Sequence, residues 1–202
     1  MNLPNQITVA RLGLSIIFFV LLGQYEQRHP QPWMLDAAWV LFAVAAGTDF
    51  LDGYLARKYK LVTPLGRILD PLVDKVLICG AFILFLGPAF VDETGVNVTC
   101  VAPWMVVVIV GRELLVTGIR GFNESRGISF GASLHGKIKM WIQSISAPTI
   151  LFIIARETQG WSGTVPGSLK LMLAWFTVLA TALSAIQYLA RSRYILQESN
   201  PA

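Results

Sequence analysis

Residues 49–74 read DFLDGYLARKYKLVTPLGRILDPLVD and contain four aspartates. Asp49 and Asp52 are three residues apart and Asp70 and Asp74 are four apart, so each pair shares one face of a helix. The connection between the pairs is short, which predicts two neighbouring antiparallel helices with converging carboxylates. Four carboxylates in one place repel one another unless cations neutralise them, and such hard oxygen ligands suit Mg²⁺ or Mn²⁺. This stretch therefore predicts a helical fold with a divalent-metal site.

A simpler interpretation of the aspartates is that they lie near helix ends, where nearby cations neutralise them. Arg57, Arg67 and Lys75 are available for this role. Two helically spaced pairs, flanked by the small residues Gly53 and Gly66 that leave room for a substrate, favour the metal site instead.

The composition indicates a membrane protein. Of the 202 residues, 54% are hydrophobic and 14% are charged, whereas soluble domains carry about 25% charged residues. A helix needs about 20 apolar residues to cross the hydrocarbon of a bilayer, and six stretches are long enough. They are residues 6–23, 34–57, 64–87, 101–121, 134–156 and 167–191. We predict an all-α integral membrane bundle of six transmembrane helices, forming a single domain over residues 1–202.

Lysine and arginine residues predict the orientation of this bundle, because loops rich in these residues stay in the cytoplasm. They gather in the connections after the second and fourth predicted helices and after the sixth. Both termini are therefore predicted to face the cytoplasm, and the active site is predicted to open on the cytoplasmic side of the inner (cytoplasmic) membrane.

Two other kinds of site find no support in the sequence. The formal net charge of +4 is not gathered in a basic patch interleaved with aromatic residues, so we expect no nucleic acid partner. Cys79 and Cys100 lack the spacing of a metal site. We expect them to be unpaired thiols, and a disulfide between them stays open as the alternative.

The spacing of residues 49–74 fits the signature D-x2-D-G-x2-A-R-x8-G-x3-D-x3-D at every fixed position. In this stretch the chain resembles the CDP-alcohol phosphatidyltransferase family. The resemblance implies a six-helix membrane enzyme that displaces CMP from a CDP-linked donor, with two divalent ions, Mg²⁺ or Mn²⁺, on the donor pyrophosphate. It also implies the following roles: Asp49, Asp52, Asp70 and Asp74 as metal ligands, Asp74 in addition as the catalytic base, and Gly53, Arg57 and Gly66 as contacts of the CDP group.

The first residues, NLPNQITVAR at positions 2–11, resemble one group within that family, the bacterial phosphatidylglycerophosphate synthases. Asn5, Thr8 and Arg11 share one face of a helix that starts early, and this face is a candidate lining of the CDP site. We therefore assign Asn5 and Thr8 to CDP binding. The alternative is that Asn5 only caps the helix and that Arg11 flanks a membrane span.

A second basic region is a candidate site for the acceptor alcohol. Arg112, Arg120, Lys137 and Lys139 are predicted to converge on an anionic group, since arginine and lysine are the usual ligands of phosphate. The alternative is that these residues are ordinary positive charges of cytoplasmic loops. This alternative explains Arg112 poorly, because apolar residues flank that arginine on both sides. The segments GRE (111–113), TGIR (117–120) and GKIKMWIQ (136–143) also resemble the bacterial phosphatidylglycerophosphate synthases. This resemblance implies CDP-diacylglycerol as the donor, glycerol 3-phosphate as the acceptor, surrounding membrane lipids, and a homodimer.

Two alternatives stay open. In the first, the reaction is the same but the acceptor is inositol phosphate, serine or phosphatidylglycerol. Gly111 and Met140 bear on this alternative, because they replace an alanine and a threonine that are familiar at these positions. In the second, the aspartates line the path of a cation channel or carrier, although such a path would need polar residues deeper in several helices.

Overall fold

Six long α-helices account for most of the chain in the computed structural model, which describes residues 3–59, 64–126, 134–161 and 168–198. Side chains are described for residues 6–48, 72–126, 136–161 and 168–190. The elements are α1 (Leu3–Gln24), α2 (Pro32–Tyr59), α3 (Pro64–Leu84), the 3₁₀ turn η1 (Pro88–Phe90), α4 (Pro103–Ser125), α5 (Leu134–Thr158) and α6 (Ser168–Glu198). Each helix coincides closely with one of the apolar stretches, so the predicted all-α class is confirmed for the described residues.

Proline defines where three of the helices begin. Pro32, Pro64 and Pro103 are the first residues of α2, α3 and α4. The N–H groups in the first turn of a helix have no partner within the helix, so proline loses nothing there and its fixed φ suits the helix.

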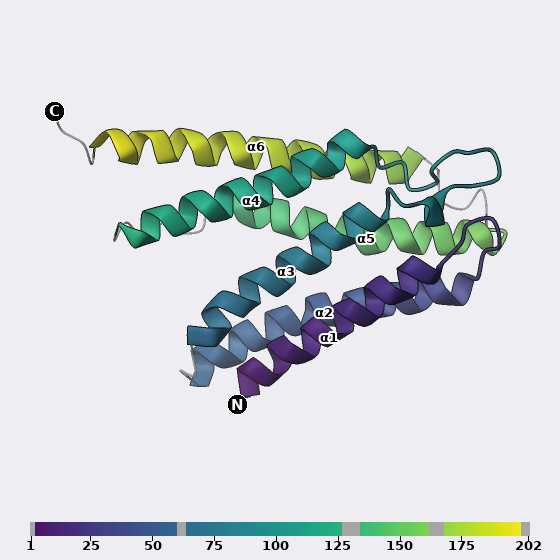
Figure 1. Ribbon diagram of the computed structural model, residues 1–202, viewed down its shortest axis with the longest axis horizontal. Helices are drawn as coiled ribbons and strands as arrows, with labels where there is room; N and C mark the ends of the chain where they lie inside the picture. Colours follow the sequence, from purple (N-terminus) through teal and green to yellow (C-terminus); the bar gives the residue numbers. More distant parts are fainter. Residues whose placement is uncertain (1–2, 60–63, 127–133, 162–167, 199–202) are drawn as a thin grey trace.

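The helices run alternately in opposite directions, so α1 begins and α6 ends at the same end of the bundle, here called the terminal end (Figure 1). The opposite, distal end carries η1. Neighbouring helices follow the order α3, α1, α2, α5, α6, α4, and α4 also contacts α3. Gly80 lets α1 approach α3 closely, because a Cβ atom there would collide with the ring of Phe19. Figure 1 shows α3 and α4 diverging towards the terminal end.

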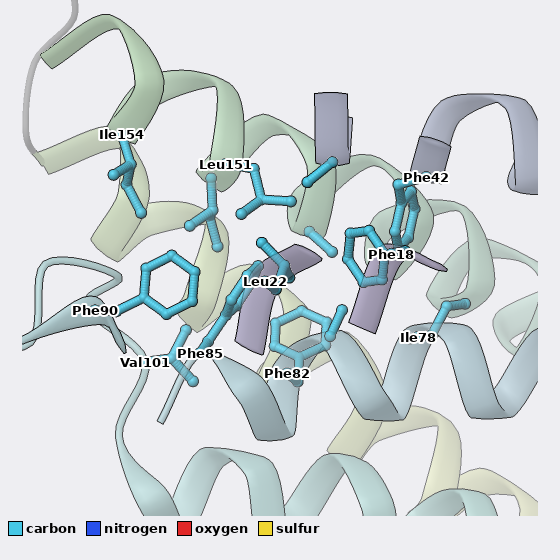
Figure 2. Close-up of a cluster of buried hydrophobic side chains, with 14 of the residues drawn as sticks. Phe18, Leu22, Phe42, Ile78, Phe82, Phe85, Phe90, Val101, Leu151 and Ile154 are labelled. Atoms are coloured by element: carbon cyan, nitrogen blue, oxygen red, sulfur yellow. The ribbon is translucent and has the colours of Figure 1, made fainter. Parts of the chain in front are cut away.

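Buried aromatic side chains form the core of the half of the bundle nearer the distal end, here called the aromatic half. Its rings are those of Phe18, Phe42, Phe82, Phe85 and Phe90, all with an exposed fraction of 0%. Phe18 meets Phe42, and Phe85 meets Phe90, edge to face with ring centroids 5.6 Å apart in both pairs. Such a pair contributes about 0.5–1.5 kcal/mol beyond the burial of its area. Figure 2 shows the rings packed together with aliphatic side chains of the same cluster.

The outer surface of the bundle is apolar, as expected for a protein in contact with lipid. Val107, Leu114 and Ile186 are each at least 65% exposed. A large exposed apolar surface marks a membrane or partner contact. Among the described residues, three helices are long and apolar enough to span a membrane, namely α1, α5 and α6. The chain is therefore a membrane-associated protein.

The distal connection between α3 and α4 is held by the side chain of Asp92. Its carboxylate accepts hydrogen bonds from the hydroxyl of Thr94 (2.6 Å) and from the backbone N–H of Val96 (3.0 Å). The bond from the Thr94 hydroxyl is the main reason that the pKa of Asp92 lies below its usual range.

Cys79 and Cys100 are both free thiols, which confirms the expectation that they are unpaired.

Candidate active site

The two aspartate-bearing helices are neighbours. α2 ends at Tyr59, α3 begins at Pro64, and the two helices contact each other. The antiparallel pair expected from the sequence is therefore present, and its joined ends lie at the terminal end of the bundle (Figure 1). The side chains of residues 49–71 lie outside the described part of the structure. The roles assigned to Asp49, Asp52, Gly53, Arg57, Gly66 and Asp70 consequently stay predictions.

Asp74 stands halfway along α3, ten residues after Pro64 and ten before Leu84. At 1.5 Å of rise per residue, this places its backbone about 15 Å from either end of the helix. Its side chain is half-buried. It interacts electrostatically with Lys75, the next residue of α3, and with Lys139 of α5. Asp74 therefore links the aspartate helices to the second basic region.

The polar face predicted for α1 is buried against the aspartate helices. Thr8 and Arg11 are exposed by only 2% and 1%, and α1 packs along α2 and α3. Ser15, one turn later, is also buried and its hydroxyl donates a hydrogen bond to the carbonyl of Arg11 (2.9 Å). Arginine is rarely buried without partners, so this face is specialised for polar contacts. The shared face of Thr8 and Arg11 is confirmed, whereas the Asn5 side chain lies outside the described residues.

Two of the four predicted acceptor cations meet on one buried carboxylate. The ammonium group of Lys139 donates a hydrogen bond to Glu113, and Arg112 Nη1 lies 3.3 Å from Glu113 Oε1 and 3.4 Å from Oε2. The three side chains are only 6–9% exposed. Two cations and one carboxylate leave the cluster with a net charge of +1. We refer to the region around Arg112, Glu113, Lys139, Asp74 and Lys75 as the charged half.

Helix α6 supports this cluster with hydroxyl groups. Arg112 Nε donates to Ser184 Oγ at 3.0 Å, and Gln143 Nε2 of α5 donates to Thr181 Oγ1 at 3.1 Å. Gln143, Thr181 and Ser184 are all buried. A guanidinium group bonded both to a carboxylate and to a hydroxyl is fixed in direction, which a phosphate-binding site requires.

The other two predicted acceptor cations do not join the cluster. Arg120 and Lys137 have exposed side chains on α4 and α5, so the structure divides the predicted set into a buried and an exposed pair. Lys75 was missed as a site residue. Its ammonium group donates a hydrogen bond to Thr117 of α4, and it interacts electrostatically with Glu113 and Arg120. The signal in the sequence was a cation directly after the last aspartate of the signature.

The aspartates fit a divalent ion by their chemistry. Carboxylates are the hard oxygen ligands that Mg²⁺ and Mn²⁺ prefer, and Asp74 is half-buried rather than sealed in the core. The described side chains contain no group of three or more metal-ligating residues. The other three aspartates lie outside that set of side chains, so a site for one or two ions stays a prediction.

Comparison with known proteins gives a consistent result. A model of the CDP-alcohol phosphatidyltransferase family matches residues 1–183. A protein of Bacillus subtilis named CDP-diacylglycerol–glycerol-3-phosphate 3-phosphatidyltransferase is 34% identical over 215 residues, covering 98% of this chain and 99% of its own. Proteins with the same name from Rickettsia bellii and Pseudomonas fluorescens are each 36% identical, over 91% and 76% of this chain and over 92% and 71% of their own.

Proposed function

Because the chain belongs to the CDP-alcohol phosphatidyltransferase family, we propose that it transfers the phosphatidyl group of CDP-diacylglycerol to glycerol 3-phosphate. The products are phosphatidylglycerophosphate and CMP. The names of its relatives support this choice of donor and acceptor. The observation that carries it is the buried pair of cations, Arg112 and Lys139, which meet on Glu113 while Lys139 interacts electrostatically with Asp74 of α3.

The residues act in two groups. Asn5, Thr8, Gly53, Arg57 and Gly66 bind the CDP group of the donor, whose acyl chains stay among the membrane lipids. The phosphate of glycerol 3-phosphate is bound by the second group, which consists of Arg112, Arg120, Lys137 and Lys139.

Asp74 connects the two groups as the general base. It accepts the proton of the free terminal hydroxyl of glycerol 3-phosphate, which attacks the phosphorus attached to diacylglycerol. The bond from this phosphorus to the bridging oxygen of the pyrophosphate breaks, and the electron pair leaves with CMP. A positioned base of this kind accelerates a reaction by about 10²–10⁴-fold.

Asp49, Asp52, Asp70 and Asp74 would hold Mg²⁺ or Mn²⁺, with two ions expected. Bound there, the metal would neutralise the negative charge of the pyrophosphate and favour the departure of CMP. The chemistry of the four carboxylates supports this assignment.

The proposal includes the arrangement in the membrane. The six helices form one domain of six spans in the inner (cytoplasmic) membrane, with both termini and the active site facing the cytoplasm and a second copy completing a homodimer. The common end of α1 and α6 (Figure 1) and the lysines and arginines near that end support this orientation. Neither the reaction nor the charge distribution calls for nucleic acid.

CMP release tests the proposal. Purified protein in detergent should release CMP from CDP-diacylglycerol only when both Mg²⁺ and glycerol 3-phosphate are present. Asp74→Asn should lower the rate by at least about 100-fold, because it removes the base. Asp92→Asn, the same change in the distal connection, is the matched control and should leave the rate unchanged. Release driven by a different alcohol would overturn the acceptor, and no release with any alcohol would overturn the enzymatic function.

A further inference from the structure

The buried cluster provides less positive charge than the acceptor needs. Glu113 binds both Arg112 and Lys139, so the three side chains carry a net charge of +1. A phosphate monoester carries a charge of about −1.5 to −2 near pH 7. An anion that leaves water must be paired with cations, because uncompensated buried charge is costly. The remaining compensating charge must come from cations outside the cluster. Arg120 and Lys137, the other two proposed ligands, are both exposed, which leaves open a position for a further cation between the cluster and Asp74.

Lys75 occupies such a position. The side chain of Lys75, on α3, reaches α4, where its ammonium group donates a hydrogen bond to Thr117 Oγ1. The Thr117 hydroxyl in turn donates a hydrogen bond to the backbone carbonyl of Glu113 at 2.6 Å. Thr117 is neutral, so this bond fixes the ammonium group without neutralising it. The side chain of Lys75 is half-buried and that of Thr117 is exposed, so the ammonium group is accessible to a ligand.

Charged side chains of α3 and α4 lie close together around the ammonium group of Lys75. Lys75 attracts Glu113 and Asp74 and is repelled by Arg120. Two cations on separate helices that are close enough to repel each other are typical of an anion site, because a bound anion relieves the repulsion. Asp74, the proposed base, precedes Lys75 directly in the chain.

We propose that Lys75 is a further acceptor-binding residue, whose ammonium group binds the phosphate of glycerol 3-phosphate and thereby places the free hydroxyl beside Asp74. This inference rests on the proposed function. Arg120 then contributes from the exposed surface of α4. Thr117 is a positioning residue, because it acts only through Lys75. The competing role for Lys75 is that of a counter-ion for the metal-binding aspartates.

The steady-state kinetics of Lys75→Met and Lys75→Arg separate these roles. Lys75→Met should raise the KM for glycerol 3-phosphate by about 10- to 100-fold, the usual cost of losing a hydrogen bond to a charged group. The KM for CDP-diacylglycerol and the Mg²⁺ concentration for half-maximal activity should stay within about twofold of the wild type. Lys75→Arg should recover part of the affinity. Arg126→Met removes one exposed positive charge from the end of α4 and is the matched control, with an unchanged KM.

Each result bears on the inference. The inference would be overturned in favour of the counter-ion role if Lys75→Met left the KM for glycerol 3-phosphate unchanged. The same conclusion would follow if this variant changed the Mg²⁺ requirement and not that KM. If Lys75→Met does not fold, Thr117→Val decides, and a KM raised by about threefold or more supports the inference whereas an unchanged KM overturns it. KM does not depend on the fraction of molecules that fold. Wild-type protein that releases no CMP with glycerol 3-phosphate would refute the proposed function itself, which is a separate outcome.

Discussion

The aromatic half and the charged half of this bundle follow opposite rules. In the aromatic half, α1, α2 and α3 bury phenylalanine rings edge to face (Figure 2). In the charged half, α4 and α5 bury an arginine, a glutamate and a lysine within one cluster. Apolar packing is inexpensive within a bilayer, whereas buried charge is costly unless it is paired. The difference teaches that three charged side chains gather in one buried cluster in the half where the proposed chemistry lies, whereas the buried Lys170 outside the charged half forms a simple ion pair with Glu157.

The largest effect is expected from Glu113→Gln in the charged half. The change removes the carboxylate that the buried cations Arg112 and Lys139 share, which should cost about 3–5 kcal/mol of stability. The two cations also lose their fixed directions, so the KM for glycerol 3-phosphate should rise. Unfolding in mixed micelles and CMP-release kinetics measure the two effects.

Glu157→Gln is the control for this experiment, because Glu157 pairs with Lys170 outside the charged half and is itself 29% exposed. Glu157→Gln should lower stability less than Glu113→Gln does, and it should leave the KM for glycerol 3-phosphate unchanged. A Glu113→Gln variant that loses stability but keeps its KM would show that the charged half is only structural, which would remove the contrast with the aromatic half.

Phe82→Ala tests the aromatic half. The ring is fully buried, and its removal should cost on the order of 3 kcal/mol, near the lower end of the range for soluble cores because lipid replaces water around the helices. The KM values for both substrates should stay unchanged in the folded fraction. A raised KM for glycerol 3-phosphate would show that packing in the aromatic half controls the distant site, and the two halves would then be a single unit.

The smallest effect is expected from Tyr25→Phe at the distal edge of the aromatic half. Tyr25 donates a hydrogen bond to Gln27 Oε1 at 2.6 Å, and its loss should cost about 1 kcal/mol near neutral pH. Burial raises the pKa of Tyr25 from 10.0 to about 12. The phenol therefore stabilises the fold fully below pH 10, and this contribution is lost as the pH rises towards 12.

Thermal unfolding of wild type and Tyr25→Phe between pH 7 and about pH 11.5 checks the sign of this linkage. The wild type should lose its advantage across the alkaline range, because only the wild type has the phenol. Parallel curves for the two proteins would contradict the assignment of the alkaline loss to Tyr25.

The sequence predicted the helices well because each depends on local properties. Apolar length and terminal residues such as Pro32 and Pro103 define helices with little help from the rest of the chain. The partners of the charged side chains depend on which helices meet, and a helix pattern does not contain that information. Of the four cations predicted to converge, Arg112 and Lys139 do meet, but the ion pair of Lys139 with Glu113 that joins them was not predicted.

Lys75 shows the same limit. Its identity was visible in the sequence, but its hydrogen bond to Thr117 depends on the crossing of α3 and α4. Lys137 shows the opposite error, in which a residue was assigned to the site but does not join the buried cluster. The motif grouped it with Lys139, although the Lys137 side chain is exposed and that of Lys139 is buried. Residues two apart on a helix point in different directions, so a closer look at the spacing could have separated them.

The position of Asp74 halfway along α3 bears on a reaction that this enzyme must avoid. Water is itself a hydroxyl compound, and any base that activates an alcohol beside CDP-diacylglycerol can also activate water and waste the donor as phosphatidic acid. In the proposed mechanism the base Asp74 is half-buried, and its backbone lies about 15 Å from either end of its helix. Partial burial of this kind reduces contact with bulk water, whereas an acceptor that carries its own anchoring phosphate is held beside the base. In this proposal the position of Asp74 thus favours transfer over hydrolysis before any catalytic group has acted.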